Sequence, residues 1–345
     1  MKDIFLAVIL CFSGISAFSS TADLENLLTK INEAESQKLP QTALTHAMEL
    51  EKKAKAEKHK GLYVRALAKR ILNQSHILGK APKDKVKILR EEVGKISEDL
   101  RPLVKIILAR WFWHYYEQNR YKFSDRTQTI GLQSDDFTTW DLNKIFAEVR
   151  ALFEDGLRSA DYLKKEEIED YNGVIERGSL FLNSSTTLYE FALREMITFL
   201  TLGTSALPAP EDKFEVDATS DAFAHHKTFL EYKPQTSDKE SPLLRGIEAY
   251  QALMKYYQEK KLLEQYVDAD VSRLKFVNAQ VSDMDKKETF LARLKEIEEE
   301  FKNVTTSTLA SFEMAKQYQS DHEYVMAVQV CQKAIERHSK SDGGI

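Results

Sequence analysis

The sequence is short of the residues that interrupt secondary structure: its 345 residues include only 12 Gly and 7 Pro. Folds made of β-strands need many tight turns, which glycine and proline supply, so this shortage favours helices. Basic residues are not in excess either, because the formal net charge is −5. A nucleic-acid-binding protein depends on a positively charged surface, so no nucleic-acid partner is predicted.

Long hydrophobic runs are also scarce. An apolar stretch over residues 4–12 is too short to cross a membrane as a helix. It follows a lysine and precedes small residues, a pattern typical of a secretory signal peptide, so we expect export with removal of residues 1–19. A lipid anchor on Cys11 is the alternative, but Leu10 stands where a lipoprotein signal needs a small residue.

Cysteine is rarer still, since removal of the signal peptide would leave Cys331 as the single thiol. One cysteine cannot cross-link its own chain, so packing must supply the stability. Its position between Val330 and Gln332 in a helical pattern predicts a small buried residue and not a nucleophile.

Motifs that carry chemistry are absent from the sequence. It has no glycine-rich phosphate loop, no G-x-S-x-G turn, no H-E-x-x-H pair and no Cys/His spacing typical of zinc. His225 and His226 are adjacent, so on a helix their side chains would point about 100° apart and could not easily share a metal. Asp125, Asp135, Asp136 and Asp141 cluster in the sequence but lack the alternate spacing and the terminal Glu of an EF-hand loop. We therefore predict no enzyme activity, no catalytic residue, no cofactor, no metal and no small-molecule substrate.

Aromatic residues gather in one central stretch. Its first helix, near residues 103–116, is apolar nearly all round, so neighbouring helices must enclose it. Before the second helix, Thr138 with Asp141 three residues later is typical of a capping box, and Phe137 with Leu142 of a hydrophobic staple. The predicted structural core of this stretch consists of Trp111, Trp113, Tyr115, Phe137, Thr138, Trp140, Asp141 and Leu142.

Apolar residues recur with helical spacing along most of the chain. Short connections join these segments, so consecutive helices are expected to pack as antiparallel hairpins. Residues 203–241 differ, because they hold four of the seven prolines and only one short helix, near 222–232. The predicted organisation is a signal peptide (1–19), a helical-repeat region (20–202), a crossover segment (203–241) and a C-terminal helical region (242–345).

The last pair of helices resembles a tetratricopeptide repeat. Ala327 and Ala334 would let the two helices approach closely, and Tyr318 and Tyr324 would fill the gap between hairpins. His322 stands where a turn glycine is common in such repeats. The predicted fold class is all-α, an α-solenoid of tetratricopeptide-like hairpins, each burying one face on the next.

Apolar residues in the final helix are spread too widely for one neighbouring helix to cover. The positions are Val325, Ala327, Val328, Cys331, Ala334 and Ile335. Repeat arrays need terminal units with a polar outer face. Val328 and Cys331 are therefore predicted to mark a candidate interface that a further domain fills.

Five runs of residues along the chain are distinctive. They are Leu108 to Arg120, Asp135 to Leu142, Thr187 to Phe191, Leu243 to Tyr250, and Asp268 to Asp270 with Arg273 and Leu274. Together they resemble the N-terminal helical region of large secreted bacterial alpha-2-macroglobulin-like proteins. The resemblance spans most of residues 20–345.

In that family the helical region precedes β-sandwich macroglobulin domains, a protease-cleaved bait segment and, in many members, a Cys-Gly-Glu-Gln thioester. The resemblance implies a non-catalytic scaffold in the periplasm or on the surface of a Gram-negative bacterium, the N-terminal module of an exported protease inhibitor. Its partners would be downstream macroglobulin domains or another protein, and proteases would be met only through the full-length parent. Cys331 is not followed by Gly-Glu-Gln, so no thioester role is implied. The alternative is a stand-alone periplasmic tetratricopeptide-type adaptor that binds a peptide or protein partner.

Overall fold

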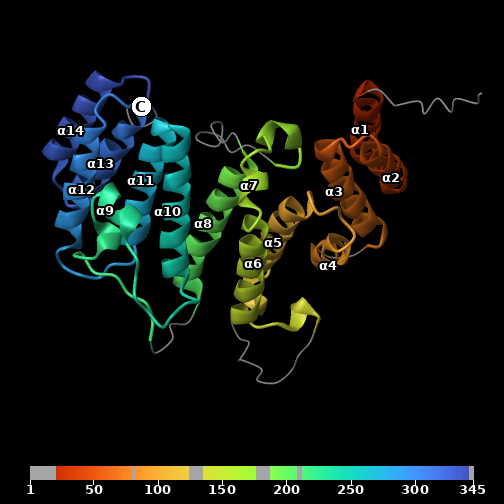
Figure 1. Cartoon of the computed structure of the whole chain (residues 1–345), viewed down its shortest axis with the longest axis horizontal. Helices are drawn as coiled ribbons and strands as arrows, with labels where there is room; N and C mark the ends of the chain where they lie inside the picture. The colour runs from red at the N-terminus through yellow and green to blue at the C-terminus, as the bar shows by residue number, and fades with distance from the viewer. Residues whose placement is uncertain (1–20, 80–81, 124–134, 176–186, 208–211, 342–345) are drawn as a thin grey trace, which may run out of the picture. The chain divides into compact units, whose positions relative to one another are not determined.

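The computed structural model describes residues 21–79, 82–123, 135–175, 187–207 and 212–341, and the predicted signal peptide lies outside these ranges. In the described ranges the chain forms fourteen α-helices and several short 3-10 turns, with no β-strand (Figure 1). The all-α fold class is confirmed, and helices that are neighbours in the chain pack on one another, as in an α-solenoid.

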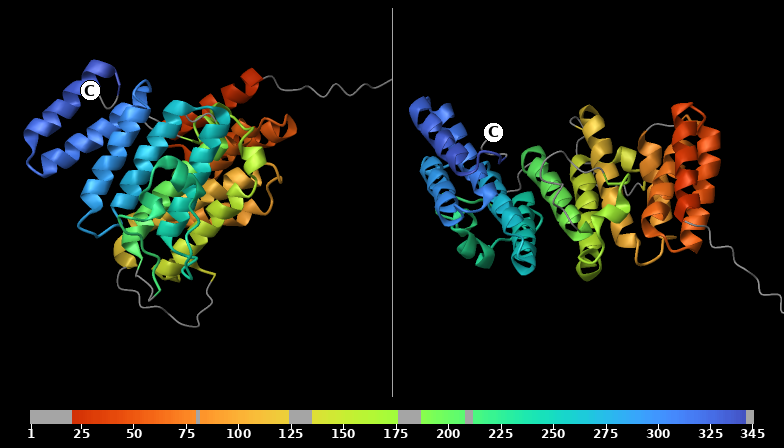
Figure 2. Two further views of the ribbon diagram at one scale, coloured as in Figure 1. Left: turned by 60° about the vertical axis from the view of Figure 1, so that its left-hand side comes forward. Right: turned by 90° about the horizontal axis from the view of Figure 1, so that it is seen from above.

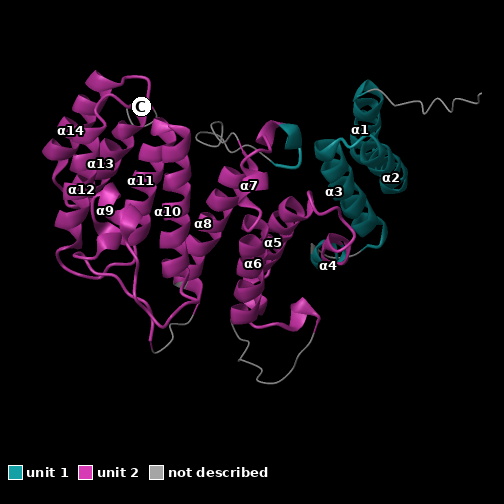
Figure 3. Cartoon of the chain, viewed as in Figure 1, with its two compact units in different colours: residues 1–88, 170–176 teal, residues 89–169, 177–345 magenta. Residues whose placement is uncertain are grey.

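The chain divides into two compact units (Figure 3). Unit 1 comprises residues 1–88 and 170–176, and unit 2 comprises residues 89–169 and 177–345. The division falls within α4 (Pro82–Val93). The boundaries predicted after residues 202 and 241 both lie inside unit 2 and stay predictions.

Unit 1 is built from α1 (Thr21–Ser36), α2 (Pro40–Ala56) and α3 (Lys60–Ile77), with α1 packed on α2 and α2 on α3. Its core alternates large and small side chains, which lets the helices approach closely. These buried residues include Leu24, Leu28, Ile31, Ala43, Ala47, Leu50, Ala54, Leu67 and Ile71. Gly61 is required for space, because a Cβ there would lie 1.7 Å from the carbonyl oxygen of Asp170.

Left-handed residues close four of the helical hairpins. Lys38, Lys58, Lys261 and His322 have φ between 57° and 62°, and each lies between two consecutive helices. His322 occupies the position at which the sequence predicted a turn glycine to be usual. Residues other than glycine rarely adopt this left-handed backbone conformation, so the packing of the flanking helices must stabilise it at these four positions.

Unit 2 begins with an aromatic centre made by α5, α6 and α8. Its helices are α5 (Arg101–Gln118), α6 (Leu142–Leu157), α7 (Ala160–Leu163), α8 (Leu188–Ala206), α9 (His226–Glu231), α10 (Pro242–Lys260), α11 (Leu263–Asn278), α12 (Lys286–Glu300), α13 (Thr308–Ser320) and α14 (Tyr324–Arg337). From α8 onward, α10, α11, α12, α13 and α14 pack in chain order, each on the one before (Figure 2). The short α9 belongs to the crossover segment and packs on α10.

Helix α5 is enclosed as its sequence predicted, with eleven of its 18 residues buried. Trp113 meets Phe146 of α6 and Phe199 of α8 edge-on, with ring centres 5.1 and 5.2 Å apart. Such edge-to-face pairs add to the free energy gained by burying the rings.

The capping box predicted before α6 is wrong. Asp141 is itself the N-cap, because its Oδ1 accepts the Lys144 N–H at 2.8 Å. Thr138 lies in a separate 3-10 turn, Phe137–Thr139, and Asp136 Oδ1 accepts the Thr138 N–H at 3.0 Å. Two short caps in succession replace the single box, since Trp140 adopts extended backbone between them.

Candidate functional site

The predicted core residues do not all have the same environment. Trp113, Tyr115, Phe137 and Trp140 are buried, whereas Trp111, Thr138, Asp141 and Leu142 are partly exposed. Phe137 contacts Tyr115 and Trp140 as well as Phe112, with ring centres 5.2 Å apart for Tyr115, whereas Trp113 contacts Tyr116, Phe146 and Phe199. Their role is packing.

A buried ionic cluster joins α8, α10 and α11. The Tyr257 hydroxyl donates to Glu190 Oε1 at 2.6 Å, and Arg194 Nε donates to the Tyr257 oxygen at 3.1 Å. Arg194 Nη2 also donates to Asp268 Oδ2 at 3.0 Å. Glu190 is fully buried, and a buried carboxylate without partners would be costly, so these contacts compensate its desolvation.

Tyr257 and Arg194 in this cluster have shifted pKa values. Burial raises the pKa of the Tyr257 hydroxyl above its ordinary range, and Glu190 adds to the rise against the opposing effect of Arg194. Burial would lower the pKa of the Arg194 guanidinium, but Tyr257, Asp268 and Glu190 together raise it. A catalytic acid or base needs a pKa near the working pH. The pKa values of Tyr257 and Arg194 are shifted away from that range, and their contacts join α8, α10 and α11.

A second buried pair attaches the crossover segment to α11. Arg273 Nε donates to Asp270 Oδ1 at 2.7 Å, and Arg273 Nη1 donates to the Ala222 carbonyl oxygen at 3.0 Å. The guanidinium carbon lies 4.6 Å from the ring centre of Phe229 in α9. Arg273 and Asp270 are 1% and 0% exposed, so this pair is part of the core.

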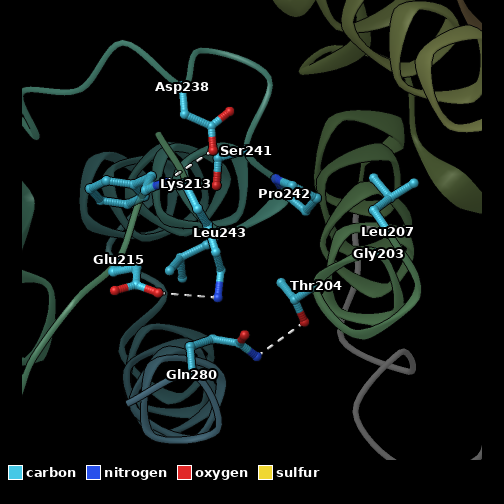
Figure 4. A pocket seen from close by; sticks show the side chains of 11 residues that line it. Gly203, Thr204, Leu207, Lys213, Glu215, Asp238, Ser241, Pro242, Leu243 and Gln280 are labelled. Atoms are coloured by element: carbon cyan, nitrogen blue, oxygen red, sulfur yellow. Dashed lines mark hydrogen bonds and ion pairs between the residues drawn. The ribbon is translucent and has the colours of Figure 1, made fainter. Parts of the chain in front are cut away.

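A cavity of about 170 Å³ lies among residues from the end of α8, the start of α10 and the crossover segment (Figure 4). Lys213 Nζ lies 3.5 Å from Glu215 Oε1, and Gln280 Nε2 donates to Thr204 Oγ1 at 3.0 Å. Ligand pockets usually measure about 300–1,000 Å³. The cavity is small and these polar side chains pair with one another, so we assign it no ligand.

His225 and His226 come together, so the expectation that their side chains diverge is wrong. His225 precedes α9 and has non-helical backbone (φ −49°, ψ 145°), which removes the helical angle between the two rings. The ring centres lie 4.1 Å apart. His225 Nε2 lies 2.7 Å from Glu300 Oε2, and His226 Nε2 lies 3.2 Å from Glu300 Oε1.

Electrostatics at these three residues follow from this geometry. Burial lowers the pKa of His226, because the charged imidazolium is desolvated. Burial works to raise the pKa of Glu300, but hydrogen bonds with His225 and His226 outweigh it and lower that pKa. The structure therefore favours neutral His226 beside ionised Glu300.

Sequence reasoning missed Glu300 and the Tyr266 hydroxyl, which lies 2.7 Å from His226 Nδ1. They stand 74 and 40 positions from His226, and no spacing rule links residues so far apart. The adjacent histidines just before a predicted short helix were the one available signal.

Helix α14 leaves most of its apolar residues exposed. Tyr324, Val328 and Ile335 are 58%, 54% and 45% exposed, and Cys331 is partly exposed. Spacings of four, three and four residues place these four side chains on one face of the helix. We call this face the α14 stripe. Ala334 is the one buried residue of α14. The prediction that Cys331 is buried is therefore wrong, because the side of α14 that carries it is not covered by another helix as Ala334 is.

Tyr324 does not fill a gap between hairpins, as the tetratricopeptide pattern predicted. Its ring is exposed, and its hydroxyl shares a hydrogen bond with His322 Nδ1 at 2.9 Å. Tyr318 is partly exposed. The prediction for Tyr324 is wrong because α14 packs on α13 through the Ala334 side of the helix.

Comparison with known proteins identifies no relative: no family description, no curated protein and no solved structure matches the chain. None of the helices in the described ranges is long and apolar enough to span a membrane. A functional assignment therefore has to rest on the side-chain geometry and on the resemblance carried by the five runs.

Proposed function

We propose that the chain is a non-catalytic helical scaffold that acts through protein–protein contacts. Its place would be the N-terminal module of an exported alpha-2-macroglobulin-like protease inhibitor. The α14 stripe is the observation that carries the proposal, because it is an apolar face at the end of an otherwise packed series of helices. A neighbouring macroglobulin domain is the proposed occupant of the stripe.

Residues in the distinctive runs support a scaffold role. Glu190, Asp268, Asp270 and Arg273 are all buried and make polar contacts with other buried or half-buried side chains. Charged groups paired in this way hold helices together, which supports a structural use of these residues.

Sequencing the gene beyond the codon for Ile345 tests the parentage. We expect an open frame that continues into segments with the period-two pattern of β-sandwich strands. A stop codon directly after Ile345 would instead favour the stand-alone periplasmic adaptor.

The first β-sandwich domain encoded by that frame can be expressed separately and titrated against the chain. Val328→Asp should weaken binding at least about 10-fold, because a charge buried without a partner is costly. Gln329→Asp is the matched control, since Gln329 is exposed on α14 outside the stripe and should tolerate the same charge. Equal affinities for the wild type and both variants would contradict the assignment of the stripe.

The chain by itself should not inhibit proteases, because the bait segment and thioester of the family are not among its residues. Residual protease activity on a protein substrate, measured with and without excess chain, checks this. A covalent adduct between the chain and a protease would show that inhibitory chemistry lies in these residues after all.

A further inference from the structure

We propose that His225, His226 and Glu300 bind one divalent transition-metal ion of the zinc class. One ligand atom from each of the three residues lies within 4.8 Å of the other two. Because α9 belongs to the crossover segment and Glu300 ends α12, the ion would tie this segment to the C-terminal helices. The inference does not depend on the proposed scaffold role.

The donor set matches the preference of zinc. Two imidazole nitrogens and one carboxylate oxygen suit Zn²⁺, whose bonds to these atoms measure about 2.0–2.2 Å. In a tetrahedral site such bonds place ligand atoms about 3.4 Å apart. The two histidines reach different oxygens of Glu300, His225 Nε2 lying 2.7 Å from Oε2 and His226 Nε2 lying 3.2 Å from Oε1. A rotation of the carboxylate that directs one oxygen between the two rings would bring three ligand atoms, already within 4.8 Å of one another, around one ion.

Solvent access leaves room for a fourth ligand. The side chains of His225 and Glu300 are 31% and 36% exposed, whereas that of His226 is 8% exposed. A site with three protein ligands and one open position can accept a water molecule. The ion would therefore sit at the protein surface with one ligand anchored in the core.

The second partner of each histidine is compatible with metal binding. Tyr266 OH lies 2.7 Å from His226 Nδ1, and a hydroxyl can accept as well as donate. A His226 Nδ1–H bond to this oxygen would leave the Nε2 lone pair for the metal, the usual arrangement of metal-bound histidine. Binding a metal through His225 Nε2 puts the ring proton on Nδ1, which can then no longer accept the Lys227 N–H. That contact is long, at 3.4 Å, so its loss costs little.

Lys227 is the competing cation. Its Nζ lies 3.6 Å from Glu300 Oε1, and its side chain is 75% exposed. An exposed lysine can swing into solvent at small cost, because surface ion pairs contribute little to stability. An ion that binds the three residues would displace it.

Zinc titration of the tag-free, chelator-treated full chain by isothermal calorimetry at pH 7.5 tests the site. We expect one equivalent of Zn²⁺ to bind, and His225→Ala or Glu300→Gln to weaken the affinity at least about 100-fold. Tyr266→Phe should weaken it about 10–100-fold as an outer partner. Lys227→Ala should strengthen it, and His322→Ala, which alters an exposed histidine outside the cluster, should leave it unchanged.

Cobalt binding can be measured on the unaltered chain, so the site can still be tested if circular dichroism shows that a variant does not fold. Four-coordinate Co²⁺ absorbs visible light much more strongly than six-coordinate Co²⁺, so we expect strong absorption when Co²⁺ binds. Adding Zn²⁺ should displace the Co²⁺ and remove this absorption. Absence of one-equivalent binding overturns the proposal. Unchanged zinc affinity in folded His225→Ala and Glu300→Gln, or a weak six-coordinate cobalt spectrum, overturns it equally.

Discussion

Helices α5 and α14 are both rich in apolar residues but differ in what surrounds them. Helix α5 buries eleven of its 18 residues between α6 and α8, whereas α14 buries one of its 14 and packs mainly on α13. The number of neighbours therefore decides how much apolar surface a helix buries. An amphipathic sequence at the end of a helical series is left with an open face.

Hydrogen exchange should show the largest difference between the two helices. Amides of α5 are expected to exchange only on global unfolding, whereas those of α14 should exchange through local opening. We expect protection in α14 to be lower by at least about 100-fold, measured by mass spectrometry of peptides. Equal protection in a strictly monomeric sample would contradict the comparison.

Trp113→Ala should lower the free energy of unfolding by about 3–5 kcal/mol, because it opens a cavity among Phe146 and Phe199. Val328→Ala on α14 should change it by less than about 0.5 kcal/mol, since its side chain is 54% exposed. Chemical denaturation followed by far-UV circular dichroism measures both. Similar effects at the two sites would show that α14 is packed more tightly than its exposure indicates.

Self-association should follow from the α14 stripe in the absence of another occupant. Sedimentation velocity over a range of concentrations is expected to show dimers of the wild type that Val328→Asp abolishes. Gln329→Asp should associate as the wild type does. Loss of association in both variants would assign it to net charge and not to the stripe.

Acid should loosen the C-terminal helices before it loosens α5. The pKa of His226 is lower in the folded chain than its ordinary 6.5, so the unfolded chain binds more protons as the pH falls below 6.5. The stability that neutral His226 contributes above pH 6.5 is therefore lost as the pH falls below that value. The pKa of Glu300 is also lower in the folded chain than its ordinary 4.5, so protonation of Glu300 causes a further loss of stability below pH 4.5. Exchange protection of metal-free protein in α9 and α12 between pH 7.5 and 5 checks the direction. A pH-independent result would show that Tyr266 and Glu300 accommodate the charged imidazole.

The sequence predicted most helices well because a core-facing stripe repeats with helical period. The first helix of the aromatic stretch was predicted near residues 103–116 and spans Arg101–Gln118. The predicted capping box is wrong because the spacing of Thr138 and Asp141 is compatible with two different capping arrangements. Either a single box or two successive caps satisfies that pattern, and the extended backbone of Trp140 decides for the second.

Side-chain clusters were harder to predict, since they depend on where helices end in space. Glu298, Glu299 and Glu300 are equivalent in the sequence, yet only Glu300 reaches the two histidines in the contacts found. The Asp270–Arg273 pair has the spacing of an ordinary surface ion pair. Its burial comes from the crossover segment, whose position no local pattern fixes.

The four left-handed hairpin turns give the shortage of glycine a further consequence. At Lys38, Lys58, Lys261 and His322 a side chain is kept where glycine would relieve backbone strain of roughly 1 kcal/mol. Part of that gain would be lost to the greater freedom of glycine in the unfolded chain. Replacing any one of these four residues by glycine would therefore raise stability slightly without changing a helix, and such positions exist in both units.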